Sequence, residues 1–88
     1  MSLFSGQTSV GTAATLIDGV AYNNPVLLHI HNNDNTDAVY IGGPDVTTSN
    51  GLKLVKEDSL EITLHQANEI YCVSTKSGHI VSWIAQKL

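Results

Sequence analysis

Residues 39–64 read VYIGGPDVTTSNGLKLVKEDSLEITL, a stretch in which short apolar runs are separated by turn-forming residues. The first run ends at Gly42-Gly43-Pro44, and a second turn is expected at Ser49-Asn50-Gly51. Leu60 to Leu64 then alternates between apolar and polar residues, which is the period of a strand with one buried face. Strands of this kind, with Gly, Pro and Asn between them, are typical of antiparallel sheets.

Working outward, the rest of the chain repeats the pattern at intervals of about ten residues, which predicts about seven strands. The expected fold is an all-β, small antiparallel β-sandwich or β-barrel, in which a helix is hard to place. Residues 1–7 are expected to form a short N-terminal arm, and 8–88 a single β domain. The expected strands include residues 8–17, 26–31, 38–41, 60–64, 70–75 and 79–85.

The composition indicates a protein that buries part of its surface against other chains. Its 88 residues make one small domain, 42% hydrophobic and 14% charged, with a net charge of −4. Roughly a quarter of the residues in an ordinary soluble domain are charged. We therefore expect an exterior that packs against copies of the same chain or against a larger assembly.

Several classes of function are disfavoured by what the sequence lacks. It has no arginine and only four lysines, whereas phosphate backbones are usually bound by clusters of both. It has no apolar run of the roughly 20 residues that span a bilayer and no signal-peptide pattern at its start. We expect a protein made in a cytoplasm that binds neither nucleic acid nor membrane. Its one cysteine, Cys72, is expected to be a buried thiol rather than a nucleophile.

His29 and His31 are the candidate metal ligands, because alternate residues of a strand lie on one face. His65 and His79 are the further histidines that would complete such a site. The pattern is similar to the metal site of cupins, but Asn35 stands where a cupin has a glutamate. The alternative is two polar residues on a half-exposed strand, and neither a metal nor a cofactor is predicted.

Other chemical motifs are incomplete. Asp34, Asn35 and Asp37 lie in one loop but lack the glycine and terminal glutamate of a calcium loop, so a solvated turn is expected. Gly42-Gly43 leads into no helix that would bind a phosphate. There is no Gly-x-Ser-x-Gly elbow and no order of residues that suggests a catalytic triad. The chain is predicted not to be an enzyme.

Aromatic and branched residues near the carboxyl end are the candidate subunit contacts. Tyr71 and Trp83 are expected to be anchors in the core or at an interface. Ile80 and Ile84 would lie on one face of the last strand, and Val81 and Trp83 on the other. Two apolar faces on one strand of a small domain predict that another chain covers one of them.

The chain resembles small virion structural proteins of tailed bacteriophages, and most of all capsid decoration, or cement, proteins. The similarity lies in Val39–Thr47 followed by Asn50-Gly51 and a leucine, and in Ile70–Ser74 followed by Gly78. It covers about two-thirds of the chain. The sequence departs from this group at Lys56-Glu57, where glycine is common.

The resemblance implies a non-enzymatic β domain on the surface of a virion, with the major capsid protein as partner. Decoration proteins commonly form homotrimers, so a trimer is expected. An arm carrying Leu3 and Phe4 would attach the domain to the shell, although a frayed terminus is the alternative.

Three alternatives to the decoration protein stay open. A head–tail connector or tail-fibre component would share the fold and the sequence pattern. A small cupin-like domain would require His29 and His31 to hold a metal. A carbohydrate-binding sandwich would require an exposed ring at Tyr40 or Trp83 on which a sugar can stack.

Overall fold

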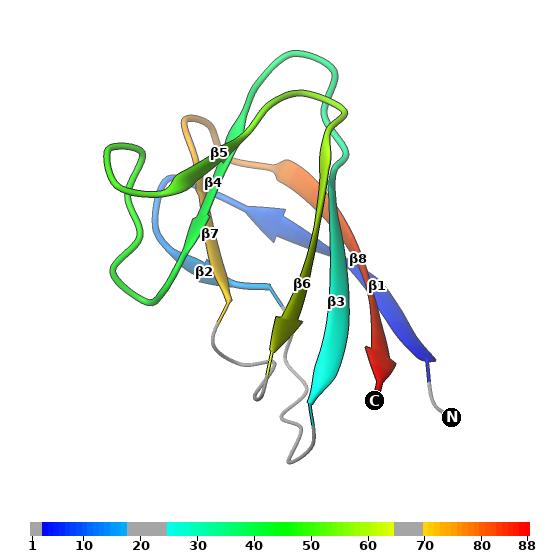
Figure 1. The fold of residues 1–88 in the computed structure, drawn as a ribbon. Helices are drawn as coiled ribbons and strands as arrows, with labels where there is room; N and C mark the ends of the chain where they lie inside the picture. The colour runs from blue at the N-terminus through cyan, green and yellow to red at the C-terminus, as the bar shows by residue number, and fades with distance from the viewer. Residues whose placement is uncertain (1–2, 18–24, 65–69) are drawn as a thin grey trace.

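The computed structural model describes residues 3–17, 25–64 and 70–88, which form two antiparallel four-stranded sheets packed as a sandwich (Figure 1). The strand orders are β1-β8-β3-β6 and β2-β7-β4-β5. Eight strands in two such sheets make a double-sheet jelly roll. The predicted all-β antiparallel sandwich is confirmed, with eight described strands instead of about seven. Their bounds are Leu3–Val10 (β1), Thr15–Leu16 (β2), Val26–Asn32 (β3), Val39–Gly42 (β4), Leu52–Leu54 (β5), Ser59–Leu64 (β6), Tyr71–Ser74 (β7) and His79–Lys87 (β8).

The expected first strand, residues 8–17, is divided between the two sheets. Its first residues end β1, which pairs with β8, whereas Thr15 and Leu16 form β2 and pair with β7. Gly11 lies at the crossing, where its carbonyl accepts a hydrogen bond from the Ser74 amide at 2.8 Å. Glycine and alanine are weak strand formers, so this segment can leave one sheet and enter the other.

The expected N-terminal arm differs from what the structure shows for Leu3–Gln7. These residues are the first part of β1, and each of them lies in register with a residue of β8, from Leu3 opposite Gln86 to Gln7 opposite Ser82. The boundary expected between residues 7 and 8 therefore falls inside a strand. This uncharged segment pairs through its backbone with the edge that β8 provides.

The core lies between the two sheets and is built from alternate residues of each strand. On β3, Val26, Leu28 and Ile30 have no exposed surface. On β6, Leu60 and Ile62 pack against the core while Glu61 is exposed, as the alternation of that stretch predicts. The described part of the chain contains no helix that could cross a bilayer.

The turns predicted between residues 42 and 51 enclose a buried valine. The Val46 amide donates a hydrogen bond to the Gly43 carbonyl at 3.0 Å, and only 6% of Val46 is exposed. A Cβ at Gly42 would lie 2.9 Å from the Val46 side chain, and one at Gly51 would lie 2.8 Å from it. The two glycines therefore leave the space in which Val46 closes this end of the sandwich.

Candidate interaction surface

The outward side of the β1-β8-β3-β6 sheet, called here the outer face, presents rows of side chains set by the strand register. One row runs from Ser5 through Ile84 and His29 to Glu61. Leu3 belongs to the next row. Within these four strands, the outward positions include one carboxylate, that of Glu61, and no lysine. The outer face is therefore poor in charge, although most of its positions are accessible to solvent.

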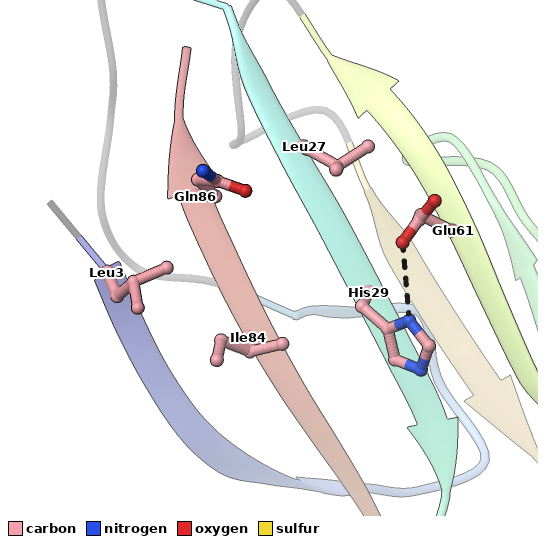
Figure 2. Close-up of a pocket in the computed structure, with 6 residues that line it drawn as sticks. All are labelled: Leu3, Leu27, His29, Glu61, Ile84 and Gln86. Atoms are coloured by element: carbon pink, nitrogen blue, oxygen red, sulfur yellow. Dashed lines mark ion pairs between the residues drawn. The ribbon is translucent and has the colours of Figure 1, made fainter. Parts of the chain in front are cut away.

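A groove of about 320 Å³ crosses the outer face and is open to solvent. Figure 2 shows side chains from all four strands pointing toward it. Leu3 is 61% exposed and Ile84 is 43% exposed, so large apolar side chains meet water here. Isolated exposed apolar residues are common, but a contiguous group of them marks a contact surface. The groove is lined by Leu3, Leu27, His29, Glu61, Ile84 and Gln86.

The polar chemistry of the groove is limited to one close pair and an amide. His29 Nδ1 lies 3.7 Å from Glu61 Oε2, and both side chains are about half exposed, at 45% and 59%. No hydroxyl or thiol occurs among the six lining residues, so the groove itself has no serine, threonine or cysteine nucleophile. The Glu61 carboxylate repels anions. The arrangement suits packing against a neutral, partly apolar surface better than enclosing a charged ligand.

The two histidine candidates lie together, but the other described histidine does not join them. His29 and His31 share the outer face of β3, as their spacing predicts, and both line a second small hollow beside Ile84. His79 is fully buried on the opposite side of the sheet, and His65 lies outside the described residues. Among residues 3–17, 25–64 and 70–88, no three His, Cys, Asp or Glu side chains gather where they could hold a metal ion.

The predicted interface residues are spread over the molecule. Leu3 lines the groove, and Phe4, the next residue of β1, is 38% exposed. Trp83 is half-buried against the core, and its indole N–H donates to Thr8 Oγ1 at 3.3 Å. Tyr71 is half-buried in the other sheet, where it pairs with residues of β2 and β4. Leu3 and Phe4 are neighbours on β1 but lie on opposite faces of its sheet, and Tyr71 and Trp83 belong to different sheets.

Sequence reasoning missed a buried polar chain formed by Asn32, His79 and Ser74, which we call the polar clamp. His79 Nε2 lies 2.6 Å from Asn32 Oδ1, and His79 Nδ1 lies 2.8 Å from Ser74 Oγ. Asn32 Nδ2 donates to three carbonyls, among them that of Leu54 at 3.0 Å. The clamp therefore joins β3 and β8 of one sheet to β5 and β7 of the other.

The hydrogen bonds of the polar clamp determine the tautomer of His79. Because Asn32 Nδ2 is the donor to the carbonyls, its Oδ1 must accept, so His79 Nε2 carries the proton. Nδ1 then accepts from the Ser74 hydroxyl. Burial lowers the pKa of His79, and the imidazole is neutral. A Ser–His–Asn chain is formally similar to a catalytic triad, but all three side chains are at most 1% exposed and meet no substrate.

The two loop carboxylates considered for calcium both contact the same lysine. Lys76 Nζ lies 2.6 Å from Asp34 Oδ2 and 3.1 Å from Asp37 Oδ2. Asp34 Oδ1 also accepts hydrogen bonds from the Thr36 and Asp37 amides. The Lys76 ammonium and these donors hold the pKa of Asp34 well below its usual range. The loop is therefore closed by an ion pair at the same end of the sandwich as the polar clamp.

Comparison with known proteins gives a fold and no family. No protein-family model and no curated protein matches the chain. The structure is similar to a solved structure from Bacillus endospore appendages, described as a novel family of disulfide-linked pili. The TM-score is 0.61 with 13% sequence identity, and the match covers 99% of this chain and 86% of that one. At this identity the similarity establishes a shared all-β fold and nothing further.

Proposed function

We propose that this chain is a non-enzymatic structural protein that decorates the capsid of a tailed bacteriophage. In this proposal it binds the outside of the shell, and its partners are the major capsid protein and further copies of itself. The observation that carries the proposal is the outer face, where exposed Leu3 and Ile84 lie on a charge-poor sheet. Burial of apolar area at such a face stabilises an interface without any chemistry.

A second candidate is a subunit of an extracellular appendage, which the fold similarity to the endospore pili favours. Covalent linkage of the kind named for those pili does not fit this sequence. Cys72, its one cysteine, is fully buried on β7, and burial raises the pKa of its thiol to about 12. A neutral thiol without access to solvent does not exchange disulfides. Subunits of this chain would therefore associate non-covalently.

Shell binding tests the proposal. The purified protein is mixed with shells assembled from the major capsid protein of the same genome and then sedimented. We expect the wild type to pellet with the shells. Ile84→Lys places a charge in the groove and should abolish pelleting, whereas Thr48→Lys, at an exposed loop position away from the outer face, should not.

The outcomes separate the candidates. Wild-type protein that is folded and stays in the supernatant would count against decoration. Filaments of the purified protein in electron micrographs would favour the appendage subunit instead. If electron micrographs of the shells showed the bound protein at one vertex alone, a head–tail component would be indicated. Equal binding by Ile84→Lys and Thr48→Lys would show that another surface attaches the protein.

A further inference from the structure

The four edge strands of the sandwich differ in how well they are protected against pairing. β2 has two residues, and β5 has three, including exposed Lys53. β6 carries exposed Glu61 and directly follows Glu57-Asp58. Short length and charge are the usual means by which an edge avoids other strands. β1 has neither, because its eight residues, LFSGQTSV, include no charged residue and no proline.

Backbone hydrogen bonds and the strand register show which backbone groups of β8 face each neighbouring strand. The Asn33 amide donates to the Ile80 carbonyl at 3.2 Å, and the Leu88 amide donates to the Pro25 carbonyl at 3.0 Å. Both bonds continue the register of β3 with β8. Hydrogen-bonded and non-bonded pairs alternate along an antiparallel ladder. The even-numbered residues of β8 therefore direct their amides and carbonyls toward β3, and the odd-numbered residues toward β1.

The same alternation fixes the orientation of β1. The odd-numbered residues of β8 lie opposite the even-numbered residues of β1, with Gly6 opposite Trp83. The backbone groups of Ser5, Gln7 and Ser9 therefore point away from β8. All three residues are exposed. An uninterrupted register over the whole of β1 makes this outward row regular.

We propose that β1 pairs with β1 of a second copy of this chain, antiparallel and across a two-fold axis. The row of outward amides and carbonyls is matched chemically by another extended strand. An antiparallel strand pairs with itself about a two-fold axis, which is the commonest symmetry of homo-oligomers. No charge on β1 opposes the approach of a second β1, whereas Glu61 on β6 would face its own copy. The two β1-β8-β3-β6 sheets then form one eight-stranded sheet.

The pairing gives even-numbered oligomers, so it differs from the trimer expected from the resemblance. It also brings the two outer faces into one continuous surface, in which Leu3 of one copy lies near the end of β1 of the other. The pairing does not depend on which assembly the chain joins. Its failure would leave the proposed attachment to a shell untouched, and the reverse is also true.

Sedimentation velocity over a wide range of protein concentrations tests the pairing. Ser5→Lys/Gln7→Lys puts two exposed lysines on β1, where a two-fold axis would bring them close to the same pair in the partner. Like charges on paired strands are destabilising. We expect a wild-type dimer, dimerisation weakened about tenfold or more in this variant, and an unchanged dimer for Ser59→Lys/Thr63→Lys on the β6 edge. A monomeric wild type, or a dimer dissociated only by the β6 variant, would overturn the proposal.

Amide hydrogen exchange gives a second readout within the same strand. In the wild type we expect the amides of Ser5, Gln7 and Ser9 to be protected, and in Ser5→Lys/Gln7→Lys we expect the amides at all three positions to exchange fast. Gly6 and Thr8, which pair with β8, should stay protected in both proteins and so report an intact fold. Fast exchange at Ser5, Gln7 and Ser9 in concentrated wild-type protein would contradict the pairing.

Discussion

At the scale of single residues, His79 links the pH of the solution to the stability of the fold. Its neutral imidazole joins Asn32 to Ser74, and burial lowers its pKa below the ordinary value of about 6.5. Because the pKa of His79 is lower in the folded protein than in the unfolded chain, the unfolded chain binds a proton at this residue more readily than the folded protein does. The stability that it contributes is therefore complete above about pH 6.5 and is lost as the pH falls below that value.

We expect the urea midpoint of the protein to decrease between about pH 7 and pH 5 for this reason. Equilibrium unfolding at several pH values measures the change, with His31→Gln as control because His31 lies on the outer face. His31→Gln should keep the pH dependence, whereas His79→Gln should reduce it. Asp34, whose pKa is also lowered, acts only below about pH 4, so the two effects are separable. A midpoint that does not change between pH 7 and pH 5 would disprove this account of His79.

Among residues 3–17, 25–64 and 70–88, two adopt the left-handed backbone region, and opposite effects of substitution are expected at them. Glu57 has a φ of 60° and Gly78 a φ of 73°. This region costs a residue with a side chain about 1–2 kcal/mol relative to glycine. Glu57→Gly should therefore stabilise the protein by up to about 1 kcal/mol, part of the gain being offset by the greater freedom of glycine in the unfolded chain.

Gly78→Ala should destabilise the protein by about 1–2 kcal/mol for the same reason. Gly43→Ala is the matched control, because a Cβ there meets no atom within 4 Å and its φ is outside the left-handed region. Thermal unfolding of the three variants measures these differences. Equal melting temperatures for Gly78→Ala and Gly43→Ala would show that the turn at residue 78 relaxes without cost.

At the scale of elements, β1 is expected to be part of the folding unit. Deletion of residues 1–7 removes five of the eight residues that pair with β8 and uncovers Trp83 on the side of Gly6. We expect a fall in melting temperature of about 10 °C or more, since 1 kcal/mol corresponds to about 4–8 °C for a domain of this size. A mobile arm would leave the melting temperature unchanged. Leu3→Ser, which keeps the strand pairing, is the control and should melt close to the wild type.

The alternation of apolar and polar residues in the sequence correctly predicted which residues of β3 and β6 face the core. Leu60, Ile62 and Leu64 on β6, and Val26, Leu28 and Ile30 on β3, face inward as their period of two requires. The split between β1 and β2 was not predictable, because β-branched residues continue through it and only the other sheet shows where the chain crosses. His29 and His31, considered as candidate metal ligands, do share a face, but the residues that lie opposite them on β6 and β8 depend on the strand order.

The polar clamp and the groove could not be predicted from the sequence, because both depend on which strands lie side by side. Asn32 and His79 are separated by 47 residues, and each belongs to a strand whose neighbours are set by the jelly-roll topology. The position of His79 on an inward face just after a turn could have indicated a buried polar contact. No residue near it in the sequence indicates that Asn32 is its hydrogen-bond partner. Leu27 and Gln86 likewise join the groove only because β3 pairs with β8. Non-local pairing is the information that a single sequence does not carry.

At the scale of the whole molecule, the low charge of the outer face is the observation that supports the proposed structural role. The chain carries a net charge of −4 with 14% charged residues, and the outer face carries less charge than that average suggests. A jelly roll alone implies no function, because shell proteins, lectins and cupins share it. The proposal of a decoration protein therefore depends on the surface and on the resemblance to virion proteins, and not on the fold.

The stoichiometry of shell binding tests this account most directly. Shells of the major capsid protein from the same genome would be saturated with the purified wild-type chain, and the copies bound per capsid subunit counted by quantitative mass spectrometry. We expect binding to saturate at one fixed ratio of chain to capsid subunit, with the chain distributed over the whole shell. Folded protein that does not bind, or that binds in only a few copies per shell, would contradict it.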